Sequence, residues 1–145
     1  VAYEPDVPSH MVLDQNARLL YIADTGNNRI AVLDTESGDE GDDLLRAEAP
    51  GTTHYAMDNA ILSTFIDGDE FGMVAPSGLE IVDDILLVTD NETSEIFAFD
   101  MNGELIDSLY TGVESGSLMG IAARSMEDIW LVSAKENRLY RLQPR

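Results

Sequence analysis

The chain has 145 residues, of which 44% are hydrophobic, so it is long and apolar enough to build one sizeable core. Acidic residues outnumber basic residues by 28 to 8, and nucleic acid or an anionic membrane would repel a chain with the resulting net charge of -20. We therefore expect neither a nucleic-acid partner nor membrane insertion, and the absence of cysteine excludes disulfides, thiolate metal sites and haem c.

The first 34 residues predict three strands. Prolines make residues 1–9 an extended lead-in, and the absence of an initiator methionine or signal peptide indicates an internal or processed start. We expect strands over 10–14, 18–23 and 29–34, the last two joined by a tight turn over 24–28 that is rich in residues tolerating left-handed backbone. The segment LLYIADTGNNRIAVLD, residues 19–34, is the most distinctive stretch of the chain.

The next stretch, residues 35–75, interrupts this pattern. TESGDEGDD over 35–43 is expected to be a charged, solvated loop, followed by a short edge strand over 44–47 and another strand over 61–66. Residues 67–72 begin like a calcium-binding EF-hand loop, but Phe71 and Gly78 fall at positions that require ligands. We therefore reject a calcium loop here.

The opening pattern then returns twice. Residues 76–81, 85–90 and 96–100 parallel 8–13, 19–24 and 30–34, and a further strand over 104–110 follows an Asn-Gly hairpin turn. The third copy comprises 118–121, 129–132 and 139–142. Gly78 and Gly120 stand 42 positions apart, about the length of one four-stranded propeller blade.

These spacings predict an all-β chain, a β-propeller with about three four-stranded blades. Blade 1 is expected over 8–75 with an insertion at 35–75, blade 2 over 76–117, and blade 3 over 118–145 without its outer strand. Known propellers close with about four to eight blades. We therefore expect the C-terminal half of a six-bladed ring, whose remaining half lies on the same or another chain; alternatively, two such halves assemble.

YIADTGNNRIAVLD resembles the core motif of NHL-repeat β-propellers, and residues 86–100 and 130–142 resemble it progressively less. The resemblance implies that Asp24 and Arg29 pin the hairpin turn and contact neighbouring strands. Asp90 and Arg138 are their structural counterparts in later copies, although Glu95 and Ser133 replace the other member of each pair.

Ligands usually bind propellers at the central channel, which the beginnings of the innermost strands surround. The repeat places His10, Gly78 and Gly120 there, with Ser9, Ser77 and Met119 beside them. His10 is a candidate metal ligand or general base, yet a single histidine without partners is more often structural. His54, within the insertion, is a second candidate that could fold over the channel.

We therefore expect a non-catalytic, extracytoplasmic module, secreted or periplasmic, that binds a protein, peptide or small ligand at its channel face. The first alternative is a metal-dependent lyase or hydrolase with zinc or calcium, its site completed by further blades. The resemblance extends to peptidyl-amidoglycolate lyases, whose zinc is held by histidines from alternate blades, but Gly120 stands where the second histidine is needed.

Gluconolactonase-like propellers instead use Glu, Asn and Asp around a divalent cation, and no spacing selects Asp14, Glu80 or Asp90 from the other carboxylates. A third reading is a structural segment of a larger assembly. The sequon at residues 91–93 is interpreted as a turn sequence.

Overall fold

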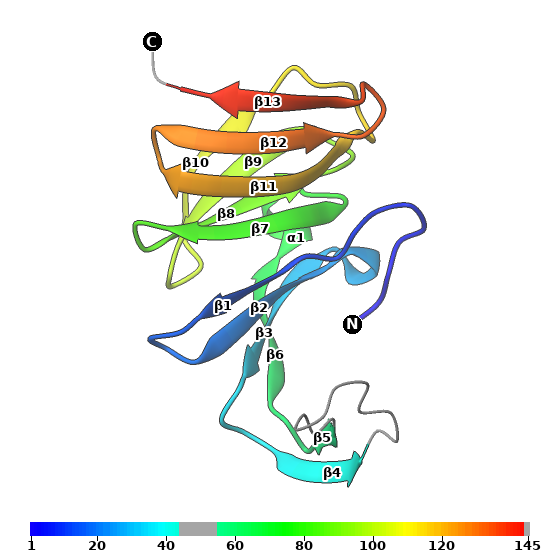
Figure 1. Cartoon of the computed structure of the whole chain (residues 1–145), viewed down its shortest axis with the longest axis vertical. Helices are drawn as coiled ribbons and strands as arrows, with labels where there is room; N and C mark the ends of the chain where they lie inside the picture. The colour runs from blue at the N-terminus through cyan, green and yellow to red at the C-terminus, as the bar shows by residue number, and fades with distance from the viewer. Residues whose placement is uncertain (44–54, 144–145) are drawn as a thin grey trace, which may run out of the picture.

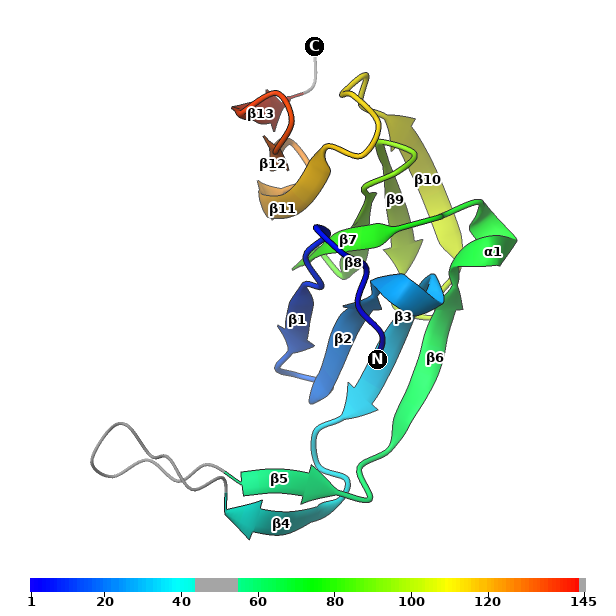
Figure 2. The same ribbon diagram turned by 90° about the vertical axis from the view of Figure 1, so that its right-hand side faces the viewer.

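Short apolar strands alternate with turns along the chain, and in the computed structural model they pair into small antiparallel sheets (Figure 1). The structure describes residues 1–43 and 55–143. Three of the sheets follow one another as blades of a β-propeller, so the predicted all-β propeller fold is confirmed. Figure 2 shows the blades in order along the molecule, with blade 2 between blade 1 and blade 3.

Blades 1 and 2 each contain four strands in meander order, with the fourth strand at the outer edge. Blade 1 consists of β1 (Met11–Asp14), β2 (Leu19–Asp24), β3 (Arg29–Asp34) and β6 (Leu62–Asp67). Blade 2 consists of β7 (Pro76–Val82), β8 (Ile85–Asp90), β9 (Glu95–Asp100) and β10 (Leu105–Tyr110).

Blade 3 contains three strands within the described residues, ordered β11-β12-β13. They are β11 (Leu118–Ser125), β12 (Asp128–Ser133) and β13 (Arg138–Leu142). In blades 1 and 2 a fourth strand pairs with the third. In blade 3 the corresponding edge, β13, has no strand beside it in this part of the chain.

The insertion in blade 1 differs from the prediction. Residues 39–43 are not a loop but β4 (Asp39–Asp43), which pairs with β5 (Tyr55–Asp58) in a hairpin that projects from blade 1. Its four carboxylates point to solvent and give no apolar alternation from which a strand can be predicted. The edge strand predicted over 44–47 lies outside the described residues.

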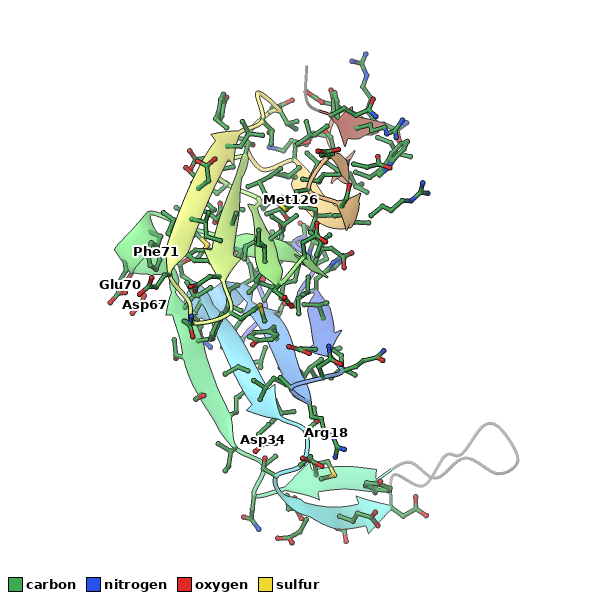
Figure 3. All side chains as sticks on the ribbon, turned by 90° about the vertical axis from the view of Figure 1, so that its left-hand side faces the viewer. Arg18, Asp34, Asp67, Glu70, Phe71 and Met126 are labelled. Carbon is green, nitrogen blue, oxygen red and sulfur yellow. The ribbon has the colours of Figure 1, made fainter. Side chains whose placement is uncertain are left out.

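The rejected calcium loop forms a single helical turn, α1 (Gly68–Phe71). The Asp67 carboxylate accepts a hydrogen bond from the Asp69 backbone N–H at 3.1 Å, as an N-cap does. Phe71 packs edge-on against Phe99 of blade 2, with 5.1 Å between ring centroids, while Glu70 points outward (Figure 3). This turn therefore joins two blades and uses a carboxylate as a cap.

Two apolar layers hold the three blades together. The layer between blades 1 and 2 is built around Tyr21, Leu86 and Phe99, and the layer between blades 2 and 3 around Leu87 and Leu131. Alternate residues of β8 enter opposite layers because side chains alternate along a strand. Blade 2 is thus covered on both faces, which explains the continuous apolar run in β8.

The innermost strands of blades 2 and 3 approach closely because glycine stands at both contact positions. A Cβ on Gly78 would lie 2.6 Å from Thr89 Oγ1 and 2.9 Å from the Ile121 backbone nitrogen, and one on Gly120 would lie 3.3 Å from His10 Cε1. The repeat position that is glycine in blades 2 and 3 is His10 in blade 1, where the imidazole covers Gly120.

Candidate functional site

The turn between the second and third strands of each blade is built around one repeat position, which is Asp24, Asp90 or Ser133. All three side chains are buried. At the same end of the blades lie the N-terminal lead-in and the loops that precede β7 and β11. These turns shape the candidate site, so their internal contacts decide how rigid it is.

In blade 1, Asp24 accepts hydrogen bonds from the Ala2 backbone N–H at 2.6 Å and from the Asn27 amide at 3.0 Å. Arg29 forms an ion pair with it, with 2.7 Å between Nε and Oδ2. Burial alone would raise the pKa of Asp24, but the hydrogen bonds from Asn27, Ala2 and Arg29 outweigh it and hold that pKa below its ordinary value. Asp24 and Arg29 thus pin the turn.

In blade 2, Asp90 also holds the turn in place, but without an arginine partner. Its two carboxylate oxygens accept four backbone N–H groups, from Val74, Ala75, Glu92 and Thr93, at distances of 2.8 to 3.0 Å. Glu95, which replaces arginine here, is therefore compatible with a pinned turn. These bonds tie the loop before β7 to the turn after β8 and fix two walls of the site.

In blade 3, Ser133 replaces the aspartate and bonds Ser117 Oγ at 2.6 Å and Glu136 at 3.1 Å. Arg138, predicted to be a structural turn residue, is exposed and makes no ion pair within residues 1–43 and 55–143. Because Ser133 stands where Asp24 stands in blade 1, Arg138 lacks the aspartate partner that Arg29 has. The predicted role of Arg138 in the turn stays a prediction.

Side chains at this end also connect successive blades. Thr25 donates a hydrogen bond to the Pro76 carbonyl at 2.7 Å, and its repeat equivalent Asn91 donates to the Leu118 carbonyl at 3.0 Å. Ser77 is fully buried and bonds Leu118 O at 3.0 Å. Ser77 therefore connects blade 2 to blade 3 by a buried hydrogen bond. This corrects its predicted role as a channel ligand.

A polar hollow of about 600 Å³ opens between these turns. All three blades and the lead-in contribute to its walls, which include Glu4, Asp6, Val74, Glu92, Met119 and Lys135. Lys135, the single lysine of the chain, donates a hydrogen bond from Nζ to the Ser115 carbonyl at 2.6 Å. The hollow thus offers carboxylates, one ammonium group and an apolar wall to a ligand.

An apolar groove of about 420 Å³ adjoins the polar hollow along blade 3. Its walls include His10, Met119, Trp130, Val132 and Leu139, and the other wall residues are Pro8, Gly120, Ile121, Ala122 and Leu131. His10 is half-buried. Met119 lines both spaces.

The predicted channel residues therefore separate into different surroundings. His10 and Met119 come together in the apolar groove. Ser9 is exposed and lies 3.4 Å from the Thr25 hydroxyl. His54 lies outside the described residues, and its predicted place over the channel stays a prediction.

Neither space has the donors of a metal centre. Among the described residues, no group of three histidine, aspartate or glutamate side chains is placed to hold a metal ion. His10 is surrounded by apolar groups rather than by carboxylates. The residues that the structure describes therefore do not form a zinc or calcium site on their own. No helix in the described part of the chain is long and apolar enough to cross a membrane.

Several wall residues were missed by the sequence interpretation. Glu92 was included in a turn sequence, and Glu4, Val74 and Lys135 were not singled out. The useful signal was the repeat itself, because Glu92 and Lys135 both stand two positions after the turn residue of their blade, Asp90 or Ser133.

The fold and the radial arrangement of blades place the chain in the class of β-propeller-type proteins. No protein-family model matches the sequence, and no curated protein matches it. Among solved structures it is similar to a luciferin-regenerating enzyme, with a TM-score of 0.67 and 13% identity, over 95% of this chain and 45% of that chain. The chain thus spans less than half the length of that enzyme, and the likeness shows the fold alone.

Proposed function

We propose that this chain is an NHL-type propeller module that binds a protein, peptide or small ligand at its channel face, outside the cytoplasm. The observation that carries the proposal is the polar hollow, because its walls come from all three blades and from the lead-in. Binding sites of repeat folds are commonly surfaces to which several repeats contribute. The extracytoplasmic location rests on the sequence resemblance and the acidic composition.

The wall chemistry supports a ligand with both polar and apolar parts. Glu4, Asp6 and Glu92 supply acceptors, Lys135 supplies donors, and Val74 and Met119 supply apolar contact. The hydrogen bonds of Asp90 and the hydrogen bond from Asn91 to the Leu118 carbonyl hold the loops in place before a ligand binds. A preformed site loses less conformational freedom on binding.

A thermal-shift screen of short peptides and small metabolites against the 145-residue chain tests this proposal. A ligand at about 100 times its Kd adds about 2.7 kcal/mol to the stability, and we expect at least one hit. The shift should disappear in Val74→Asp, because Val74 is exposed on the wall. It should persist in Tyr110→Asp, an exposed residue of β10 that does not line the hollow. Hits that survive Val74→Asp would contradict the proposal.

A metal-dependent lyase or hydrolase is the second candidate, favoured by His10, a candidate metal ligand that lines the apolar groove. It requires ligands beyond those that this chain supplies around His10. Metal analysis separates the two candidates: zinc or calcium bound in stoichiometric amount, and lost in His10→Ala, would support the enzyme and defeat the non-catalytic module.

A further inference from the structure

The two outermost blade faces expose repeat positions that are buried between blades. We define the blade 3 end face as Trp130, Val132 and Leu139, which point away from blade 2. Trp130 is 43% exposed, whereas its repeat equivalents Tyr21 and Leu87 are 2% and 1% exposed. A position that is core in two blades thus lies on the surface in the third.

The opposite end of the molecule shows the same change. Met11 of β1 is 63% exposed, whereas its repeat equivalents Leu79 and Ile121 are 3% and 6% exposed. Strand register also aligns four leucines across blade 1 on this side. We define the blade 1 end face as Met11, Leu13, Leu20, Leu33 and Leu62. Val12, between the first two, faces blade 2.

The charges of the two ends are complementary. The C-terminal stretch 118–145, which contains the strands of blade 3, has five basic and three acidic residues, a net charge of +2. Residues 8–75, the stretch of blade 1 and its insertion, contain three basic and 13 acidic residues, a net charge of -10. At the blade 3 end face, Arg141 lies 5.3 Å from the centroid of the Trp130 ring, and Arg124 is exposed on the same blade.

We propose that the blade 3 end face of one copy of this chain packs on the blade 1 end face of a second copy. Each chain has one face of each kind, so two copies related by a two-fold axis form the same contact twice. This closes a ring of six blades, within the range of about four to eight that propellers use. The chain also matches 45% of the comparison enzyme's chain, so two copies supply nearly that length.

The dimer would leave no large apolar end face open. It would also bury the apolar groove between blades, whereas the polar hollow lies at the turn end and stays accessible. The inference therefore does not depend on what the hollow binds. At about 0.15 M salt the Debye length is about 8 Å, so repulsion between distant carboxylates of the two acidic chains is largely screened.

Sedimentation equilibrium of the 145-residue chain at about 0.15 M salt tests the inference. We expect a mass twice that of the single chain of 15.9 kDa. Trp130→Glu and Leu13→Arg, at opposite ends, should each weaken dimerisation at least tenfold. Ile106 is an apolar residue of β10 that is somewhat more exposed than Trp130 and Leu13 and lies away from both end faces. Ile106→Glu should therefore leave dimerisation unchanged, and circular dichroism checks that every variant keeps its strand content.

A wild-type chain that is folded but sediments as a single copy would overturn the inference. The end faces would then be expected to pack against a different polypeptide. Polymers larger than two copies would also overturn it, because a head-to-tail contact that does not close produces fibres. Loss of the dimer in Ile106→Glu to the same extent would show that the end faces are not the interface.

Discussion

Blade 2 and blade 3 share one strand pattern and differ in what lies beside them. Leu87 and Trp130 occupy the same repeat position, yet the first is buried against blade 3 and the second faces solvent. The local sequence does not account for this difference, since both strands are apolar runs of the same length. In a radial fold, the exposure of an apolar residue reports whether the next blade is present.

The largest expected effect is the difference in stability loss between substitutions at Leu87 and at Trp130. Leu87→Ala removes a core side chain between two blades and should lower the free energy of unfolding by about 2–5 kcal/mol. Trp130→Ala, measured at dilution where the chain is a single copy, should lower it by about 1 kcal/mol or less. Urea denaturation measures both. Equal losses would mean that the blade 3 end face is already covered in the single chain.

The contact between inner strands gives a second comparison. Gly78→Ala should destabilise by about 1–3 kcal/mol, because the added Cβ would meet Thr89 and the backbone of Ile121. Gly120→Ala should have a smaller effect, since the imidazole of His10 can move aside whereas backbone atoms cannot. Thermal melts of both variants rank them, and the reverse order would contradict the close approach of β7 and β11.

The pinned turns give a third comparison, between blades 1 and 2. Asp90→Asn keeps the shape of the side chain but turns an amide N–H2 toward backbone N–H groups that need an acceptor. We expect a loss of about 1–3 kcal/mol. The hydrogen-exchange rates of the Val74 and Ala75 amides should also rise in this variant. Unchanged exchange would show that Asp90 does not hold the loop that walls the polar hollow.

The smallest effect concerns the pH dependence of the turn in blade 1. The pKa of Asp24 is lower in the folded chain than in the unfolded chain, where an aspartate titrates near about 3.9. Its contribution to stability is therefore complete above that value and is lost as the pH falls through the lower folded pKa. The stability difference between wild type and Asp24→Asn should narrow below about pH 4, and a constant difference in urea melts would contradict this.

Much of the fold could be predicted because the repeat supplies information that single strands lack. The strands of all three blades follow from apolar runs and turns that recur at fixed spacing. The hairpin of β4 and β5 could not be predicted, because Asp39, Glu40, Asp42 and Asp43 show no apolar alternation. Pairing with a distant strand, rather than local propensity, decides its conformation.

Less of the candidate site could be predicted, because it is formed between blades. The repeat places His10 near Met119, and both line the apolar groove. It does not show which way each side chain points. For that reason Ser77 was expected at the channel, although it is buried. Lys135 and Asp6 are far apart in sequence and share a wall of the polar hollow. Only the packing of the blades brings them together.

The central claim is that each end face is an unpaired blade interface that fits the other. Mixing Trp130→Glu chains with Leu13→Arg chains tests it most directly, because a mixed dimer contains one interface without either substitution and another in which the two substitutions, of opposite charge, share one interface. We expect each variant alone to sediment as a single chain and the mixture to recover a species of twice that mass. A mixture that remains monomeric, while the wild-type chain dimerises, would contradict the claim.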